Sequence, residues 1–153
     1  MKIKTILVID DDNTVHEMVD EFLSGEVEKI SHAHTPEDGL RMATQQLPSL
    51  VLLDITMPRM DGLKVCRHLK ESERTRDIPV LFLTVDHNIR HLAKALECGG
   101  SDYIMKPFNP VELRARVRAA LRTKEMIDLL KEQARIDALT GVNNRTALDE
   151  ALN

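Results

Sequence analysis

Five polar residues of this chain stand where runs of apolar residues end, and their types suit the transfer of a phosphoryl group. A carboxylate can act as a nucleophile, several carboxylates can bind a divalent cation, and an ammonium and a hydroxyl can contact phosphoryl oxygens. This combination is typical of phosphoryl transfer to an aspartate. The residues are Asp10, Asp11, Asp54, Thr84 and Lys106.

The three aspartates repel one another if they lie in one crevice. Two like charges about 5 Å apart cost about 3 kcal/mol at an effective dielectric constant near 20. A proton or a divalent cation relieves this repulsion. Oxygen ligands suit Mg²⁺, whereas zinc sites use histidine or thiolate ligands, which these strand ends lack. The residue types therefore predict one Mg²⁺ ion near Asp10, Asp11 and Asp54.

The apolar runs before these residues predict the strands of a parallel sheet. The run at 50–53 is apolar throughout, as in a strand buried on both faces. Strands alternate with segments of helical spacing, which predicts a doubly wound α/β fold with right-handed crossovers. The carboxyl ends of the strands then meet at one edge. The predicted strands are 4–9, 27–34, 50–54, 78–84 and 103–105, and the predicted helices are 13–24, 35–46, 63–71, 87–98 and a last helix after 109.

The last helix is predicted to continue beyond the globular domain. It begins at Asn109, where the sequence has a capping box and a hydrophobic staple. Apolar residues at the 3/4 spacing continue past the length that a small domain needs. We therefore expect a helical stalk over residues 123–136 that pairs with a second copy, and a solvated helix end is the alternative. The stripe consists of Ile127, Leu130 and Ala134.

Length and charge narrow the functional classes. The chain has 153 residues and a formal net charge of −4, so no direct nucleic-acid partner is expected, because phosphate binding needs a basic surface. No apolar run reaches the roughly 18 residues of a membrane span, and a signal-peptide pattern is missing. Cys66 and Cys98 lack metal-type spacing and are expected as reduced thiols. These observations predict a cytoplasmic protein that does not bind membranes.

Residues 3–122 resemble the receiver domains of two-component response regulators. The resemblance rests on the acidic pair, the segment Asp-x-x-Met-Pro-x-x-Asp-Gly that begins at Asp54, and Lys-Pro-Phe at 106–108. It implies a (βα)5 flavodoxin-like fold with the strand order 2-1-3-4-5 and an extended C-terminal helix. It assigns residues 1–122 to the receiver domain and implies a cis peptide bond before Pro107.

The resemblance also implies how the acidic residues act. Asp54 is expected to be the phosphoacceptor. Asp11 is expected to bind Mg²⁺ directly and Asp10 through water, and Asp54 and the carbonyl of Thr56 complete the metal site.

Three further residues resemble the switch elements of the family. Thr84 corresponds to the switch hydroxyl, Tyr103 to the switch aromatic residue and Lys106 to the invariant lysine. Val85 departs from the pattern, because receivers usually carry a small residue there. We expect a β-branched side chain at this position to slow dephosphorylation.

The implied function is a phosphorylation-dependent switch. A sensor histidine kinase or a phosphotransfer protein is expected to phosphorylate Asp54, which adds a charge of about −2. The change is expected at the face formed by helix 87–98, strand 103–105 and the last helix. A homodimer through this face and the stalk can then bring two output domains together. The chain itself is not expected to be an enzyme.

Residues 137–153 carry a second resemblance. The segment 137–145, Asp-Ala-Leu-Thr-Gly-Val-Asn-Asn-Arg, is similar to the opening of GGDEF domains, the diguanylate cyclases. The Gly-Gly-Asp/Glu-Glu-Phe motif and the residues for GTP are missing, so this chain cannot make cyclic di-GMP. The resemblance implies the regulatory part of a diguanylate cyclase or of a degenerate relative. A capped loop with a short helix is the alternative.

Two other functions stay open. Asp10-x-Asp12-x-Thr14 matches the nucleophile motif of haloacid-dehalogenase-like phosphatases. That interpretation leaves the motif at 54–62 unexplained and lacks an acidic pair after Lys106. The second alternative is a pseudo-receiver that only makes protein contacts and is independent of phosphorylation.

The histidines receive structural interpretations. His32 and His34 point to the same side of an exposed strand, and His87 and His91 are one helical turn apart on a solvated helix. The two other histidines have no partner that the sequence can name. They are His16 and His68.

Overall fold

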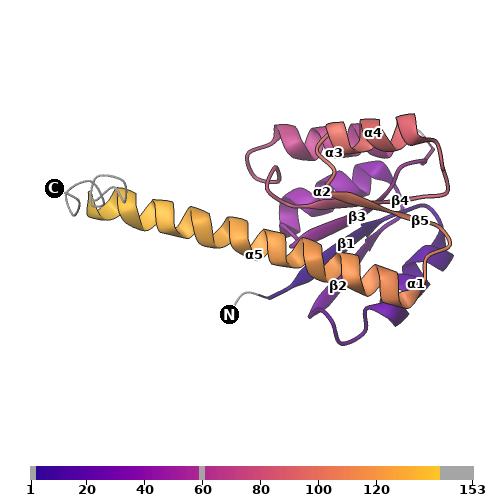
Figure 1. The fold of residues 1–153 in the computed structure, drawn as a ribbon, viewed down its shortest axis with the longest axis horizontal. Coiled ribbons are helices and arrows are strands. Elements are labelled where there is room, and N and C mark those ends of the chain that lie inside the picture. Colours follow the sequence, from indigo (N-terminus) through magenta and orange to yellow (C-terminus); the bar gives the residue numbers. More distant parts are fainter. Residues whose placement is uncertain (1–2, 59–60, 142–153) are drawn as a thin grey trace.

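The computed structural model describes residues 3–58 and 61–141. Five parallel strands form one sheet in the order β2-β1-β3-β4-β5, with helices on both faces (Figure 1). The predicted doubly wound fold and its strand order are therefore confirmed. The elements are β1 (Thr5–Ile9), α1 (Asn13–Phe22), β2 (Lys29–Ala33), α2 (Pro36–Gln46), β3 (Leu50–Asp54), α3 (Gly62–Glu71), β4 (Val80–Thr84), α4 (Ile89–Glu97), β5 (Asp102–Met105) and α5 (Pro110–Thr140).

The core consists of two apolar layers, one on each face of the sheet. Alternate residues of a strand point to opposite faces, so Ile6 and Val8 pack with residues of α1 and α5. Leu7 and Ile9 pack with residues of α2, α3 and α4. All five residues of β3 are buried. A strand covered on both faces explains why its sequence is apolar without alternation.

Some predicted element boundaries differ by one or two residues from the observed ones. β2 is limited to Lys29–Ala33 because its parallel partner β1 begins at Thr5, which lies opposite Lys29. β4 begins at Val80, which pairs with Val51, rather than at residue 78. The helix predicted over 87–98 begins at Ile89, because the side chain of Asn88 caps it by accepting a hydrogen bond from the backbone N–H of Arg90.

α5 packs on the sheet in its first part and stands away from it in its second part. The Asn109 side chain caps the helix by accepting a hydrogen bond from the backbone N–H of Glu112 at 2.8 Å. Phe108 and Leu113 lie in one buried cluster, as the hydrophobic staple predicts. α5 continues without a break to Thr140 and projects from the domain (Figure 1). The domain boundaries at 122 and 136 stay predictions, because the helix runs through both.

The second part of α5 exposes apolar side chains. Leu129 and Leu130 are 66% and 64% exposed, respectively. Ion pairs link this part to the domain: Lys4 Nζ lies 3.4 Å from Glu125 Oε1, and Lys131 pairs with Asp77. Exposed ion pairs contribute little to stability. In the described part of the chain, no helix is long and apolar enough to cross a membrane.

Candidate functional site

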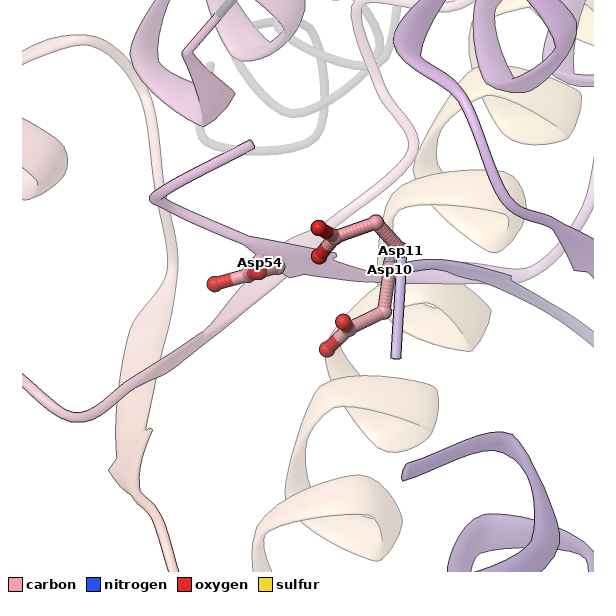
Figure 2. Close-up of side chains that lie close together, drawn as sticks. All are labelled: Asp10, Asp11 and Asp54. Carbon is pink, nitrogen blue, oxygen red and sulfur yellow. The ribbon is translucent and has the colours of Figure 1, made fainter. Parts of the chain in front are cut away.

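Three carboxylates meet at the carboxyl ends of β1 and β3. Asp10, Asp11 and Asp54 each offer a carboxylate oxygen, and these oxygens all lie within 4.8 Å of one another. Figure 2 shows the three side chains gathered at the ends of the two strands. Asp10 and Asp54 are buried, whereas Asp11 is exposed. The cluster is therefore open to solvent on the side of Asp11.

The loop after β3 holds Asp54 tightly. The backbone N–H of Thr56 donates a hydrogen bond to Asp54 Oδ1 at 3.2 Å. Gly62 opens α3 so close to the strand end that a Cβ atom there would lie 2.2 Å from the carbonyl oxygen of Asp54. Its backbone N–H donates to the carbonyl of Ile55 at 2.6 Å. The glycine of the Asp-Gly pair therefore allows α3 to pack closely against the strand that carries Asp54.

Lys106 lies between two of the carboxylates. Its Nζ lies 2.8 Å from Asp10 Oδ2 and 3.6 Å from Asp54 Oδ1. The peptide bond between Lys106 and Pro107 is cis, as the resemblance implied. The backbone N–H of Lys106 donates to the carbonyl of Thr84 at 2.6 Å. The ends of β4 and β5 thus bring a positive charge to the acidic cluster.

The electrostatics of the cluster are unfavourable for an ionised Asp54. Burial raises the pKa of Asp54 from 3.8 to about 6, and the charge of Asp10 adds to this rise. Lys106 and the backbone N–H of Thr56 act in the opposite direction, and Asp11 adds a smaller upward contribution. A single ammonium therefore does not offset the burial of two neighbouring carboxylates. Added positive charge at this place stabilises the ionised form.

The predicted switch residues lie on the next two strands. The Thr84 side chain is buried, and its Oγ1 accepts a hydrogen bond from the backbone N–H of Asp86 at 2.9 Å. Tyr103 is half-buried, packs against the layer on the α2–α4 face and pairs in register with Phe82. Thr84 therefore lies at the carboxyl end of β4, the strand next to β3, and Tyr103 lies one strand further from Asp54.

The residues of the cluster fit a hydrated Mg²⁺ ion. The donors are carboxylate oxygens, which Mg²⁺ prefers, and the open side at Asp11 leaves room for water ligands. The pKa of Asp54 is raised to about 6 by burial first and by the charge of Asp10 second, although Lys106 lowers it. A divalent cation therefore complements both the donor set and the charge of the site.

Two other sets of predicted residues lie outside the site. In the stalk, Ile127 is half-buried, and Leu130 and Ala134 are exposed. The segment that resembles the opening of a GGDEF domain is helical up to Thr140, and its residues 142–145 lie outside the described residues.

The histidine interpretations hold only in part. His32 lies on β2 and His34 directly after it, and both rings contact His16, which agrees with side chains that point the same way. His91 pairs with Asp86 in the loop after β4. The sequence named no partner for His16, yet its Nε2 lies 2.8 Å from the carbonyl oxygen of Asp10. The sequence offered one signal for this contact, since His16 follows the predicted metal ligand Asp10 by six residues.

Comparison with protein families separates the receiver from the phosphatase alternative. Residues 6–118 match the model of the response regulator receiver domain. The chain belongs to this family. Receiver domains bind Mg²⁺ at an acidic pocket, which here is the cluster of Asp10, Asp11 and Asp54. They are phosphorylated by histidine kinases or phosphotransfer proteins. The match favours the receiver over the phosphatase alternative, and Asp12, which that alternative required, instead caps α1.

Curated relatives share the receiver domain but are longer. The chain is 40% identical over 128 residues to the response regulator PleD of Caulobacter vibrioides, covering 84% of this chain and 28% of PleD. It is 39% identical over 122 residues to RpaA of Synechocystis sp., a DNA-binding dual master transcriptional regulator, covering 80% of this chain and 51% of RpaA. The chain therefore spans about half or less of the length of these relatives.

Solved receiver structures have the same fold. The BeF3-activated receiver domain of DrrB is 32% identical and has a TM-score of 0.71, with 79% of this chain and 99% of that chain covered. The receiver domain of NtrX from Brucella abortus is 31% identical with a TM-score of 0.71, covering 77% and 98% of the two chains.

Proposed function

We propose that phosphorylation of Asp54 switches this receiver domain and that the stalk carries the signal to an output domain. The observation that supports this most strongly is the contact of Lys106 with both Asp10 and Asp54 at the open acidic cluster. The chain thus supplies a carboxylate, a cation-binding pair and an ammonium at the carboxyl edge of the sheet.

The residues of the cluster have separate tasks in the transfer. Asp10, Asp11, Asp54 and the carbonyl of Thr56 would hold Mg²⁺, which neutralises charge on the phosphoryl oxygens when bound. A carboxylate oxygen of Asp54 forms the new bond to phosphorus, and the bond from phosphorus to the donor group breaks. Lys106 donates to a phosphoryl oxygen, since its Nζ lies 3.6 Å from Asp54 Oδ1. Each task follows from the charge and reach of the side chain.

Thr84 provides the link from the site to the surface. Its Oγ1 accepts a hydrogen bond from the backbone N–H of Asp86. The hydroxyl proton of Thr84 can therefore be donated to a phosphoryl oxygen. A shift of Thr84 toward the phosphoryl group pulls the loop between β4 and α4 through this bond. Tyr103, on the neighbouring strand, can move into the space that Thr84 leaves. The switch is then a shift between conformers that both exist before phosphorylation.

α5 connects this surface to the stalk. It begins at Pro110, four residues after Lys106 in the chain, and runs to Thr140 as one helix. Leu130 and Leu129 are exposed on it, and exposed leucines on a long helix are typical of a surface that pairs with another helix. We infer that the phosphorylated form dimerises through the α4-β5-α5 face and the stalk, in which Ile127, Leu130 and Ala134 contribute to the seam.

The output we propose is a diguanylate cyclase domain that makes cyclic di-GMP. The segment 137–145 supports it by its similarity to the opening of GGDEF domains. The relatives do not select an output, because RpaA, which matches equally well, is a DNA-binding regulator. The kinase or phosphotransfer protein that acts on this chain is expected to meet it in the cytoplasm, which agrees with the free thiols of Cys66 and Cys98.

The test is the oligomeric state with and without a phosphoryl mimic. We expect Mg²⁺ and beryllofluoride together to convert the chain from monomer to dimer in sedimentation velocity. Asp54→Asn should stay monomeric under the same conditions, whereas Asp38→Asn, an exposed change on α2, should dimerise like the natural sequence. Dimerisation of Asp54→Asn on addition of beryllofluoride, or no response of the natural sequence, would contradict the proposal and favour a pseudo-receiver.

A further inference from the structure

The backbone carbonyl of Asp10 has an unusual partner. Asp10 is fully buried, and a buried carbonyl without a hydrogen bond lowers stability considerably. The carbonyl lies at the end of β1, before the cap of α1 at Asp12. His16, on α1, supplies the partner: its Nε2 donates to this oxygen at 2.8 Å. The His16 side chain is itself buried.

The His16 ring is fixed in turn by a second histidine and an aspartate. His16 Nδ1 lies 2.6 Å from Nδ1 of His32, and Nε2 of His32 lies 2.9 Å from Asp20 Oδ1. Both ends of this chain of bonds are acceptors, the carbonyl of Asp10 and the carboxylate of Asp20. In every assignment that satisfies these contacts, His16 carries a proton on Nε2, because the carbonyl oxygen can only accept, and one proton lies between the two Nδ1 atoms. Burial holds the pKa of His16 below its ordinary value, which agrees with a neutral His16.

This network joins three elements behind the acidic cluster. His16 and Asp20 are four residues apart and lie on one face of α1, and His32 reaches between them from β2. His34, in the loop that follows β2, lies against the His16 ring with centroids 4.1 Å apart. The His16 ring therefore has little freedom to rotate away from the carbonyl of Asp10.

The peptide that His16 contacts links two residues of the acidic cluster. The carbonyl of Asp10 and the N–H of Asp11 belong to one planar peptide group. A hydrogen bond that fixes the carbonyl oxygen therefore also fixes the orientation of the backbone at Asp11. The other polar groups of Asp10 are also bound: its N–H donates to the carbonyl of Ala33 at 3.1 Å, Oδ1 accepts from the N–H of Asp12 at 2.9 Å, and Oδ2 accepts from Lys106. His16 completes the set.

We propose that His16, held by His32 and Asp20, is a positioning residue for the magnesium site, because it sets the plane of the peptide between Asp10 and Asp11. His16 does not contact the carboxylate oxygens of the cluster through this bond and acts through the backbone. This inference rests on the magnesium site of the proposed function. Partners behind the ligands of a metal site commonly change metal affinity by roughly 10- to 100-fold.

The experiment is a Mg²⁺ titration of the whole chain, followed by the backbone amide signals of the acidic loop in NMR spectra. We expect His16→Phe, which keeps an aromatic ring but loses the bond to Asp10, to weaken Mg²⁺ binding about tenfold. His16→Gln keeps a donor at the position of Nε2 and should recover most of the affinity. His34→Phe, which keeps the ring contact with His16, is the matched control and should bind Mg²⁺ like the natural sequence.

The imidazole ¹⁵N signals provide a readout that a merely structural role does not move. In the natural sequence they should show His16 protonated at Nε2, and His32→Phe should shift them and weaken Mg²⁺ binding about threefold, a smaller change than that of His16→Phe. Since His32 is half-buried, this variant also serves if His16→Phe fails to fold. Mg²⁺ affinity unchanged in both variants would overturn the inference, as would a failure of His16→Gln to recover affinity. Absence of Mg²⁺ binding by the natural sequence would instead overturn the proposed function.

Discussion

The acidic cluster and the stalk depart in opposite ways from the usual distribution of residues. The cluster buries Asp10 and Asp54, whereas carboxylates usually stay in water. The stalk exposes Leu129 and Leu130, whereas leucines usually lie in a core. The first region concentrates negative charge around one lysine, and the second presents apolar side chains to water.

This comparison indicates where the molecule responds to a signal. A region whose residues are fully satisfied, such as the two apolar layers around the sheet, gains nothing from a further partner. The cluster gains from positive charge, as the raised pKa of Asp54 indicates, and the stalk gains from burial of its leucines. The single helix α5 connects the domain to the stalk, so an event at one region can change the other.

The largest expected effect contrasts the two parts of α5. Leu113 is fully buried and Leu130 is 64% exposed. Leu113→Ala should lower the free energy of unfolding by about 3 kcal/mol, because it leaves a cavity in the core. Leu130→Ala should change that of the monomer by less than about 0.5 kcal/mol. Urea denaturation measures both values. A loss at Leu130 as large as that at Leu113 would mean that the stalk packs on its own domain.

A smaller effect of opposite sign is expected at the acidic cluster. The folded state raises the pKa of Asp54 from 3.8 to about 6, so ionisation of Asp54 lowers stability as the pH rises through this window. Asp54→Asn removes this loss and keeps an acceptor for the N–H of Thr56. We expect it to raise the free energy of unfolding by about 1–2 kcal/mol at about pH 7.5 without Mg²⁺, after allowing for screening by solvent.

The gain in the free energy of unfolding from Asp54→Asn should depend on the pH and on Mg²⁺. It should shrink as the pH falls toward about 4, because Asp54 is then protonated in the folded state and increasingly protonated in the unfolded state. It should also shrink when Mg²⁺ is added. Thermal unfolding followed by circular dichroism across this pH range measures the difference. Equal stability of the two proteins at neutral pH without Mg²⁺ would show that the charges of the cluster are already balanced.

The smallest effect concerns the lifetime of the phosphorylated state. Val85 is 65% exposed and follows Thr84, which is buried. If its branched side chain limits the approach of water to the site, Val85→Ala should speed dephosphorylation about threefold, equivalent to about 0.6 kcal/mol in the barrier. The decay of the phosphorylated chain, followed by electrophoresis on a phosphate-binding gel, measures this. A decay that is unchanged or slower in Val85→Ala would contradict the expectation.

The strands and the acidic cluster were predictable because their signals are local. The run at 50–53 is apolar throughout and ends at Asp54, and the observed β3 has the predicted bounds. Parallel strands bring their carboxyl ends to one edge, so the meeting of Asp10, Asp11 and Asp54 follows from the fold alone. The pairing of strands also sets their limits, which explains why β2 is shorter than its weakly alternating sequence predicted.

Other features depend on how the elements pack and could not be predicted from local sequence. The contact of His16 with His32 depends on how α1 is rotated against β2, and residue spacing does not encode this. The motif that begins at Asp54 does not say why it ends in glycine; Gly62 is required for space, since a Cβ atom there would collide with the backbone of β3. The end of the receiver domain within α5 has no local signal either, because the helix continues through it.

The most direct test of the account is to locate the phosphoryl group. The chain is incubated with acetyl phosphate and Mg²⁺, the acyl phosphate is reduced with borohydride, and the modified residue is identified by tandem mass spectrometry. The account predicts modification of Asp54, dependent on Mg²⁺ and absent from Asp54→Asn. Modification of Asp10 instead, or an unmodified natural sequence under conditions that label another receiver domain, would contradict it.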